Sequence, residues 1–226
     1  MIVYVITDKG ETARRGGGFQ NHKVTLEDLS GDVCLVLHYT QARLSLLADL
    51  RPWAVCHSGG GAEYKDYDVL RRRNYQRVIR EWQGAQIGFC GGHQIVAHSF
   101  GSTLGHMGKV KSREADHNPG YHAGLYKEWG VYPITVVRSD PIFNGLGKTL
   151  RMQEYHMDEV KRLGRDLVLL ASSARCRVQV FKHRAKPIYG TQFHPEQSPE
   201  SSPDGRKLLE NFFRIAREYP SGATRE

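Results

Sequence analysis

A cysteine flanked by glycines limits, more than any other feature, how this chain can fold. In Gly88-Phe89-Cys90-Gly91-Gly92 the cysteine follows the short apolar stretch Gln86-Ile87 and precedes the apolar-periodic segment Ile95–Phe100. A sharp turn from a strand into a helix tolerates only small neighbours, and the glycines supply that space. The start of the helix would aim unpaired backbone N–H groups at the sulfur and favour its thiolate form. The pattern therefore predicts a strand–turn–helix elbow that presents Cys90 as a nucleophile.

A thiol nucleophile needs a base, and a motif near the other end of the chain offers one. In Tyr189-Gly190-Thr191-Gln192-Phe193-His194-Pro195-Glu196, the imidazole of His194 can take the proton. Residues two apart in an extended segment project to the same side, so Glu196 can lie beside the ring and fix its tautomer. The two motifs together predict a catalytic triad of Cys90, His194 and Glu196. Without Cys90, the pair of His194 and Glu196 would fit a surface ion pair equally well.

Apolar runs rich in β-branched residues recur along the chain and predict the strands of one sheet. Helix-like stretches at Leu44–Leu50 and Val69–Trp82 separate the early runs, so successive strands are expected to be parallel with crossover helices. We expect an α/β fold with an open, mostly parallel, doubly wound sheet and helices on both faces. It should form a single domain of residues 1–226, of which 220–226 are a loose tail. The runs are Ile2–Ile6, Val33–Leu37, Trp53–Cys56, Ile134–Val137, Leu167–Leu170, Val178–Phe181 and Ile188–Phe193.

The two motifs also predict where the site lies. Ligands of such sheets bind beyond the carboxyl ends of the strands, where Gly59, Cys90 and His194 would converge. Two other segments match no mechanism: Lys9–His22 is expected to be a surface loop, and Gly101–Trp129, rich in glycine, histidine and charge, an irregular or hairpin insert.

The motifs GFCGGHQ (88–94) and YGTQFHPE (189–196) resemble the nucleophile and base motifs of class I, or triad-type, glutamine amidotransferase domains. Ser58-Gly59-Gly60-Gly61 resembles the oxyanion loop of that family, although Gly61 stands where many members carry proline. Residues 204–213 resemble its closing helix, so the similarity spans about Val55 to Arg217. The resemblance implies a stand-alone domain with the flavodoxin-like sheet of that family.

The resemblance also assigns roles to further residues. The backbone N–H groups of Gly60 and Gly91 would hold the developing oxyanion, which in such enzymes contributes several kcal/mol per donor. The segment 154–160 would hold the amino acid end of glutamine, mostly through its backbone. The residues that the family pattern places around oxyanion and substrate are Gly59, Gly60, Gly91, Gln94, Tyr155 and His156.

The implied activity is hydrolysis of glutamine to glutamate and ammonia through a thioester on Cys90. The ammonia would pass to a separate ATP-dependent synthetase, because these residues contain no ATP-binding synthetase portion. No redox or metal cofactor is required by this chemistry. A second interpretation is a stand-alone γ-glutamyl hydrolase or peptidase that cleaves a γ-glutamyl amine. A third, from another class, is a noncatalytic regulatory protein, against which the complete triad argues.

Composition sets limits on partners and location. The net charge of +8 is not concentrated, and Arg71-Arg72-Arg73 fits a solvated helical face, so a nucleic acid partner is not expected. No apolar stretch approaches the roughly 18 residues of a membrane span. The four cysteines have no CxxC spacing, which suggests a reducing, cytoplasmic setting. A zinc site is not expected either, because these histidines lack HxxxH or HExxH partners: His93, His98, His117 and His122.

Overall fold

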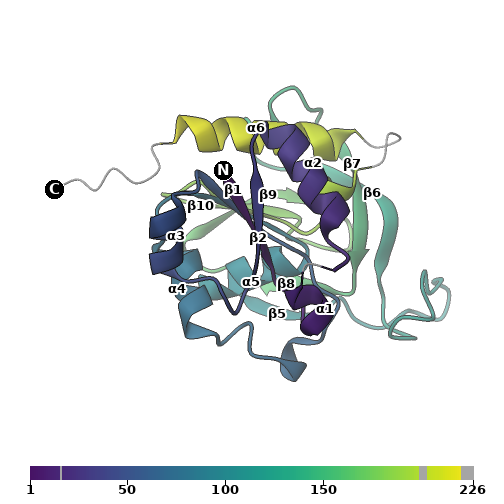
Figure 1. Ribbon diagram of the computed structural model, residues 1–226. Coiled ribbons are helices and arrows are strands. Elements are labelled where there is room, and N and C mark those ends of the chain that lie inside the picture. Colours follow the sequence, from purple (N-terminus) through teal and green to yellow (C-terminus); the bar gives the residue numbers. More distant parts are fainter. Residues whose placement is uncertain (16, 199–202, 220–226) are drawn as a thin grey trace.

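The computed structural model describes residues 1–15, 17–198 and 203–219 (Figure 1). The expected loose tail, 220–226, therefore lies outside the described residues. The helices are α1 (Glu11–Arg14), α2 (Gln20–Ser30), α3 (Leu44–Leu50), α4 (Arg73–Glu81), α5 (Gly91–Ser99) and α6 (Asp204–Glu218), with single turns η1 (Tyr64–Asp66), η2 (Pro141–Phe143) and η3 (Pro195–Gln197). The strands are β1 (Ile2–Ile6), β2 (Cys34–His38), β3 (Ala54–His57), β4 (Ala85–Phe89), β5 (Thr103–His106), β6 (Glu128–Val136), β7 (Thr149–His156), β8 (Asp158–Arg162), β9 (Leu167–Ser172), β10 (Val180–His183) and β11 (Ile188–Thr191).

The central sheet has nine strands in the order β2-β1-β3-β4-β11-β10-β9-β6-β7. Pairing is parallel from β2 across to β11, and antiparallel from β11 onward to β7. The expectation of an α/β, mostly parallel sheet with helices on both faces is confirmed. Three strands of the antiparallel part, β6, β9 and β10, overlap apolar runs that the sequence predicts as strands, but their antiparallel direction was not predicted.

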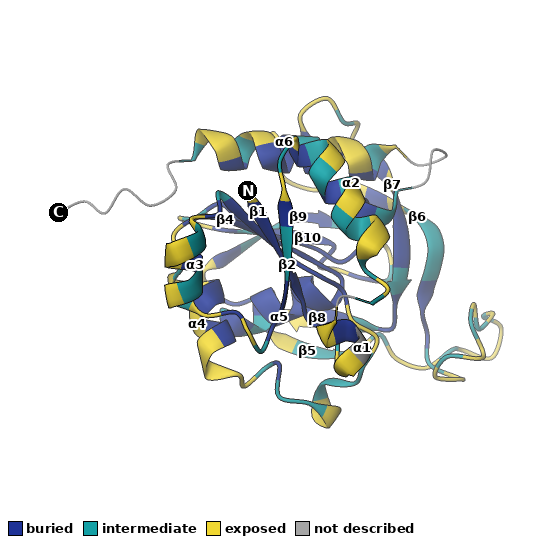
Figure 2. Ribbon diagram, in the orientation of Figure 1, coloured by how far each residue is buried: buried dark blue, intermediate teal, exposed yellow. Residues whose placement is uncertain are grey.

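Two hydrophobic cores lie on opposite faces of the sheet, because successive side chains of a strand point to opposite sides. In β1, Ile2 and Tyr4 belong to the core that α2 and α6 cover, whereas Val3 and Val5 belong to the core that α3, α4 and α5 cover. Figures 1 and 2 show these two helical layers, with the dark-blue buried strands between them. Strands buried on both faces read as continuous apolar runs, which is why they stood out in the sequence.

Two sequence expectations need correction. The segment Lys9–His22 is only partly a loop, because α1 lies inside it and α2 begins at Gln20. The helix expected over Val69–Trp82 begins only at Arg73. The insert Gly101–Trp129 is largely irregular, and its strand β5 pairs with β8 in a separate two-stranded sheet.

Among the described residues, no helix is long and apolar enough to cross a membrane.

Candidate active site

The turn between β4 and α5 holds Cys90 in an unusual backbone conformation. Its φ of 47° and ψ of −107° lie outside the regions that non-glycine residues favour. Such strain persists where the surrounding structure enforces it. The backbone N of Cys90 donates to the carbonyl oxygen of Thr191 at 2.8 Å, which fastens the elbow to β11. A methyl group on Gly92 would lie 2.3 Å from the carbonyl oxygen of His57, so the packing of β3 against the elbow requires glycine there.

His194 and Glu196 form a buried pair just beyond the end of β11. Nδ1 of His194 lies 2.8 Å from Oε1 of Glu196, and the two residues are only 7% and 3% exposed. The expected contact is present, but an extended segment is not what produces it. The single turn η3 instead folds Glu196 back onto the ring. The backbone N of His194 donates to the carbonyl oxygen of Gln153 at 2.9 Å, which anchors the histidine to β7.

The side chains of Cys90 and His194 lie next to each other beside Gly59, in the loop 58–61 that the sequence analysis compared with an oxyanion loop. A methyl group on Gly59 would lie 2.9 Å from Cε1 of His194 and 3.4 Å from Cβ of Cys90, so glycine is needed at their junction. Burial alone would lower the pKa of His194, but the charge of Glu196, followed by the charge and hydrogen bond of Cys90, raises this pKa well above its usual value. The structure thus brings all three predicted triad residues together.

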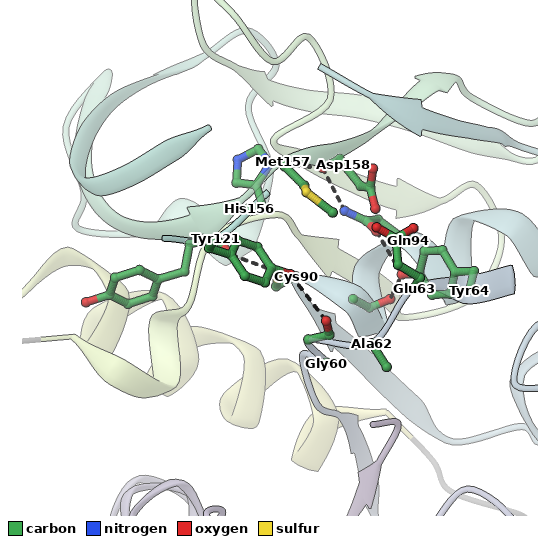
Figure 3. Close-up of a pocket in the computed structure, with 13 residues that line it drawn as sticks. Gly60, Ala62, Glu63, Tyr64, Cys90, Gln94, Tyr121, His156, Met157 and Asp158 are labelled. Carbon is green, nitrogen blue, oxygen red and sulfur yellow. Dashed lines mark hydrogen bonds between the residues drawn. The ribbon is translucent and has the colours of Figure 1, made fainter. Parts of the chain in front are cut away.

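A cavity next to Cys90 contains almost all the other predicted site residues (Figure 3). A methyl group on Gly91 would lie 2.9 Å from the backbone N of Gly60, so these two residues touch beside the sulfur. The carbonyl oxygen of Tyr155 lies 3.8 Å from Sγ of Cys90. Lining residues outside the motifs of the sequence analysis are Ala62, Glu63, Tyr64 and Tyr121, whereas Met157 and Asp158 belong to the predicted substrate-holding segment 154–160.

Gln94 forms part of the cavity wall through a fixed side-chain amide. Its Nε2 donates to the carbonyl oxygen of Asp158 at 2.8 Å and to Oε1 of Gln192 at 3.0 Å. Its Oε1 accepts a hydrogen bond from the hydroxyl of Tyr64 at 2.7 Å. The amide therefore links β8, η1 and the residue that follows β11 around the cavity, and one lone pair of Oε1 stays available to a ligand.

The ring of His156 does not serve the cavity directly. Its Nε2 lies 3.0 Å from Oε2 of Glu128 and 3.2 Å from Oε2 of Glu154, in a fully buried cluster. Burial would lower the pKa of His156, but the charges of Glu154 and Glu128 raise it well above its usual value. The ring also lies 2.9 Å, through Nδ1, from the carbonyl oxygen of Asp158, so it anchors the turn between β7 and β8.

The same cluster contains the described residues that come closest to a metal-binding arrangement. Donor atoms of Glu128, His156 and Cys176 lie within 4.8 Å of one another. The Glu128 carboxylate, however, already accepts hydrogen bonds from Ser173 at 3.0 Å and Gln179 at 2.9 Å, besides its contact with His156. Its polar contacts are those of a hydrogen-bonded network, which is sufficient to explain the cluster.

A second cavity opens on the His194 side of Cys90. It is wider than the first and its lining is mostly apolar, with the rings of Phe19, Trp129 and Tyr155. Cys90 lines both cavities. The sulfur of Cys90 is therefore accessible from both sides, to a ligand in the first cavity and to a small molecule in the second.

Comparison with known families agrees with the site geometry. Residues 23–216 match the family model of class-I glutamine amidotransferases. The chain belongs to this family, and the predicted family and enzyme class are confirmed.

More specific relatives share one name, that of the glutamine-hydrolysing subunit of GMP synthase. The one from Pyrococcus furiosus is 30% identical over 207 residues, which cover 89% of this chain and 96% of the relative. The protein of the same name from Pyrococcus abyssi is 36% identical over 172 residues, which cover 75% of this chain and 78% of the relative. A crystal structure of a Thermoplasma acidophilum protein, assigned as a GMP synthase component, has a TM-score of 0.74 and 28% identity, covering 97% of this chain and 95% of that one.

The role of Glu196 can be tested through the pH dependence of glutamine hydrolysis. We expect Glu196→Gln to lower kcat by about 10²–10⁴-fold, because the ring loses the partner that fixes its tautomer. Glu196 carries the largest charge effect that raises the pKa of His194, so its removal lowers that pKa. Because hydrolysis of the thioester needs the neutral ring, the rising limb of the kcat profile should move to lower pH. A variant whose profile keeps the wild-type position would contradict the assignment.

Proposed function

We propose that this protein is the glutamine-hydrolysing component of a two-subunit GMP synthase. It converts glutamine to glutamate and ammonia and passes the ammonia to a separate ATP-dependent synthetase. The observation that carries the proposal is the meeting of Cys90, His194 and Glu196 beside a small polar cavity. The relatives named as glutamine-hydrolysing components of GMP synthase, one of them aligned over 96% of its own length, support the choice of product.

The first chemical step is attack of the Cys90 sulfur on the side-chain amide carbon of glutamine. The amide oxygen becomes a tetrahedral oxyanion, which the backbone N–H groups of Gly60 and Gly91 stabilise; one such donor is worth about 3–4 kcal/mol. The contact between these two glycines, and the space that Gly59 leaves under the histidine, support this placement.

His194 moves the protons in both halves of the reaction. It gives a proton to the departing nitrogen, and the C–N bond breaks to leave ammonia and a γ-glutamyl thioester on Cys90. The neutral ring then takes a proton from water as the water attacks the thioester, and glutamate leaves with the sulfur restored. Glu196 holds Nδ1 throughout, which leaves Nε2 free for the transfer.

The two cavities divide substrate from leaving group. We place glutamine in the first cavity, whose wall includes Gln94 and the backbone of Tyr155 and His156. Ammonia leaves on the His194 side, into the second cavity. A synthetase that covers this second cavity would receive the ammonia before it is protonated in bulk water.

We infer that residues 1–226 act as one domain, because β1 and β11, from opposite ends of the chain, lie in the same sheet.

We also propose a cytoplasmic location. Cys34, Cys56, Cys90 and Cys176 are all free and buried, an arrangement suited to a reducing compartment.

Transfer of nitrogen to the synthetase provides the test. The protein is mixed with the GMP-forming synthetase of its own organism, ATP, the nucleotide acceptor and glutamine labelled with ¹⁵N in the amide group. We expect GMP to carry the label even when unlabelled ammonium is present in excess, as mass spectrometry would reveal. GMP labelled no more than the free ammonium pool would reject direct delivery.

The γ-glutamyl hydrolase alternative predicts a different substrate preference. The second cavity could hold a leaving group larger than ammonia, which keeps this candidate open. L-γ-glutamylethylamide and glutamine can be compared as substrates of the isolated protein. If the ethylamide is cleaved at least as fast as glutamine, and the synthetase stimulates neither reaction, the hydrolase assignment replaces the one proposed here.

A further inference from the structure

Two buried hydroxyl groups contact the loop 58–61, and the glutaminase mechanism does not use them. Thr7 follows β1 and Ser58 follows β3, and these strands are parallel neighbours in the sheet, with Val5 opposite His57. Thr7 and Ser58 are both 0% exposed. Because buried hydroxyls need hydrogen-bonding partners, the partners of this pair show what the two side chains hold in place.

The two hydroxyls and the backbone of the loop form a closed set of hydrogen bonds. The backbone N of Thr7 donates to Oγ of Ser58 at 2.9 Å, and Oγ1 of Thr7 donates to the carbonyl oxygen of Ser58 at 2.9 Å. Oγ of Ser58 in turn donates to the carbonyl oxygen of Gly59 at 2.7 Å, which also lies 3.4 Å from Oγ1 of Thr7. Each hydroxyl has one proton to donate, and at the shortest distances the two protons go to different carbonyls. Two successive peptide groups of the loop are therefore held from the ends of β1 and β3.

The direction of the Gly60 N–H follows from the planarity of the peptide group. In a trans peptide the C=O and N–H bonds point in opposite directions. The carbonyl oxygen of Gly59 accepts from the buried hydroxyl, so the N–H of Gly60, in the same peptide group, points the other way. A methyl group on Gly91 would lie 2.9 Å from this nitrogen, and Gly60 lines the first cavity together with Cys90 (Figure 3). The hydroxyls thus fix the orientation of a donor beside the sulfur.

We propose that Thr7 and Ser58 are positioning residues, which keep the N–H of Gly60 directed at the oxyanion. The inference rests on the proposed function, because this N–H matters only if an oxyanion forms beside Cys90. Three consecutive glycines, 59–61, give the loop little rigidity of its own. Without the hydroxyls the peptide group between Gly59 and Gly60 can rotate, and its carbonyl oxygen then faces the developing negative charge. A donor that is oriented in advance stabilises this charge without reorganisation during the reaction.

The test removes each hydroxyl in turn. Thr7→Val replaces a hydroxyl by a methyl group at nearly constant shape, and Ser58→Ala deletes the other one. In both variants kcat for glutamine should fall about 10–100-fold, less than the roughly 10²–10³-fold loss that follows deletion of an oxyanion donor. KM should change little, because the oxyanion exists in the transition state and not in bound glutamine. Thr7→Ser keeps the hydroxyl and should restore most of the rate. Hydrolysis is followed with and without the synthetase.

Alkylation of Cys90 by iodoacetamide separates the loss of oxyanion stabilisation from a general disturbance of the site. Iodoacetamide reacts with the sulfur by direct displacement of iodide, so no tetrahedral oxyanion forms. The alkylation rate of Cys90, measured by mass spectrometry, should therefore stay close to that of the wild type in both variants. Ser102→Ala is the matched control, because Ser102 is only 4% exposed, accepts a hydrogen bond from the backbone N of Gly164 at 2.9 Å and lines neither active-site cavity. This control should keep both rates.

Two results would overturn the inference. Unchanged kcat in Thr7→Val and Ser58→Ala would show that the N–H of Gly60 needs no external support. Equal slowing of hydrolysis and of alkylation would show that the hydroxyls only support the fold. If Ser58→Ala does not fold, the comparison of Thr7→Val with Thr7→Ser decides alone. A wild-type protein that hydrolyses glutamine yet transfers no nitrogen to the synthetase would reject the proposed function, whereas the loss of kcat in these variants would still support the positioning role.

Discussion

Replacing Cys90 by alanine is expected to abolish glutamine hydrolysis, with a fall in kcat of at least about 10⁴-fold. Without the sulfur no thioester can form, and the oxyanion donors of Gly60 and Gly91 have no covalent intermediate to stabilise. Release of glutamate from glutamine, followed with and without the synthetase, provides the measurement. Labelling with a glutamine-like chloroketone should disappear in the same variant.

A second cysteine provides the control for this substitution. Cys34 is buried at the start of β2 and lines neither active-site cavity. Cys34→Ala should keep both the hydrolysis rate and the labelling, apart from a modest loss of stability. Cys90→Ala should still bind glutamine, because the cavity wall is intact. If this variant kept more than about one per cent of the activity, the thioester mechanism would have to be abandoned.

His194→Asn is expected to lower kcat by about 10³–10⁴-fold. Asparagine can neither protonate the leaving nitrogen nor activate the water, so both halves of the reaction slow. Because the second half depends wholly on a base, the γ-glutamyl thioester that does form should persist on Cys90. Mass spectrometry of enzyme quenched after mixing with glutamine would detect this adduct.

The pH dependence distinguishes the loss of the base from a general disturbance. The wild-type kcat should rise as pH passes through the raised pKa of His194, whereas the variant should lose this limb. His117→Asn is a suitable control, because His117 is exposed in the insert and lines neither cavity. A variant at His194 that accumulated no adduct and kept the wild-type pH profile would show that another group acts as the base.

The sequence predicted the features that depend on short local patterns. The elbow at Cys90 was recognisable because glycine spacing and the change from strand to helix lie within a few residues. The convergence with His194 followed from the rule that parallel strands share their carboxyl ends. The predicted contact between Glu196 and the ring of His194 is present, but the expected extended segment is not. The single turn η3 brings Glu196 to the ring instead.

Other features depend on contacts that a local pattern does not encode. The helix α2 was missed because it is mostly polar, with only Leu26 and Ser30 buried. The antiparallel strand β7 interrupts its buried residues with exposed Thr149 and Arg151, so it lacks the continuous apolar run of a parallel strand. Glu63 carries no motif, and its place at the cavity wall exists only once the neighbouring turn η1 packs against Gln94.

The position of Cys90 between two cavities has a consequence for the timing of turnover. If the γ-glutamyl group on the sulfur occupies the first cavity, as proposed, ammonia that leaves and water that enters both pass through the second cavity, one after the other. A synthetase that covers the second cavity to keep ammonia from escaping also delays the entry of the water that hydrolyses the thioester. Glutamine consumption then keeps pace with the acceptor reaction on the neighbouring protein, and little nitrogen is wasted.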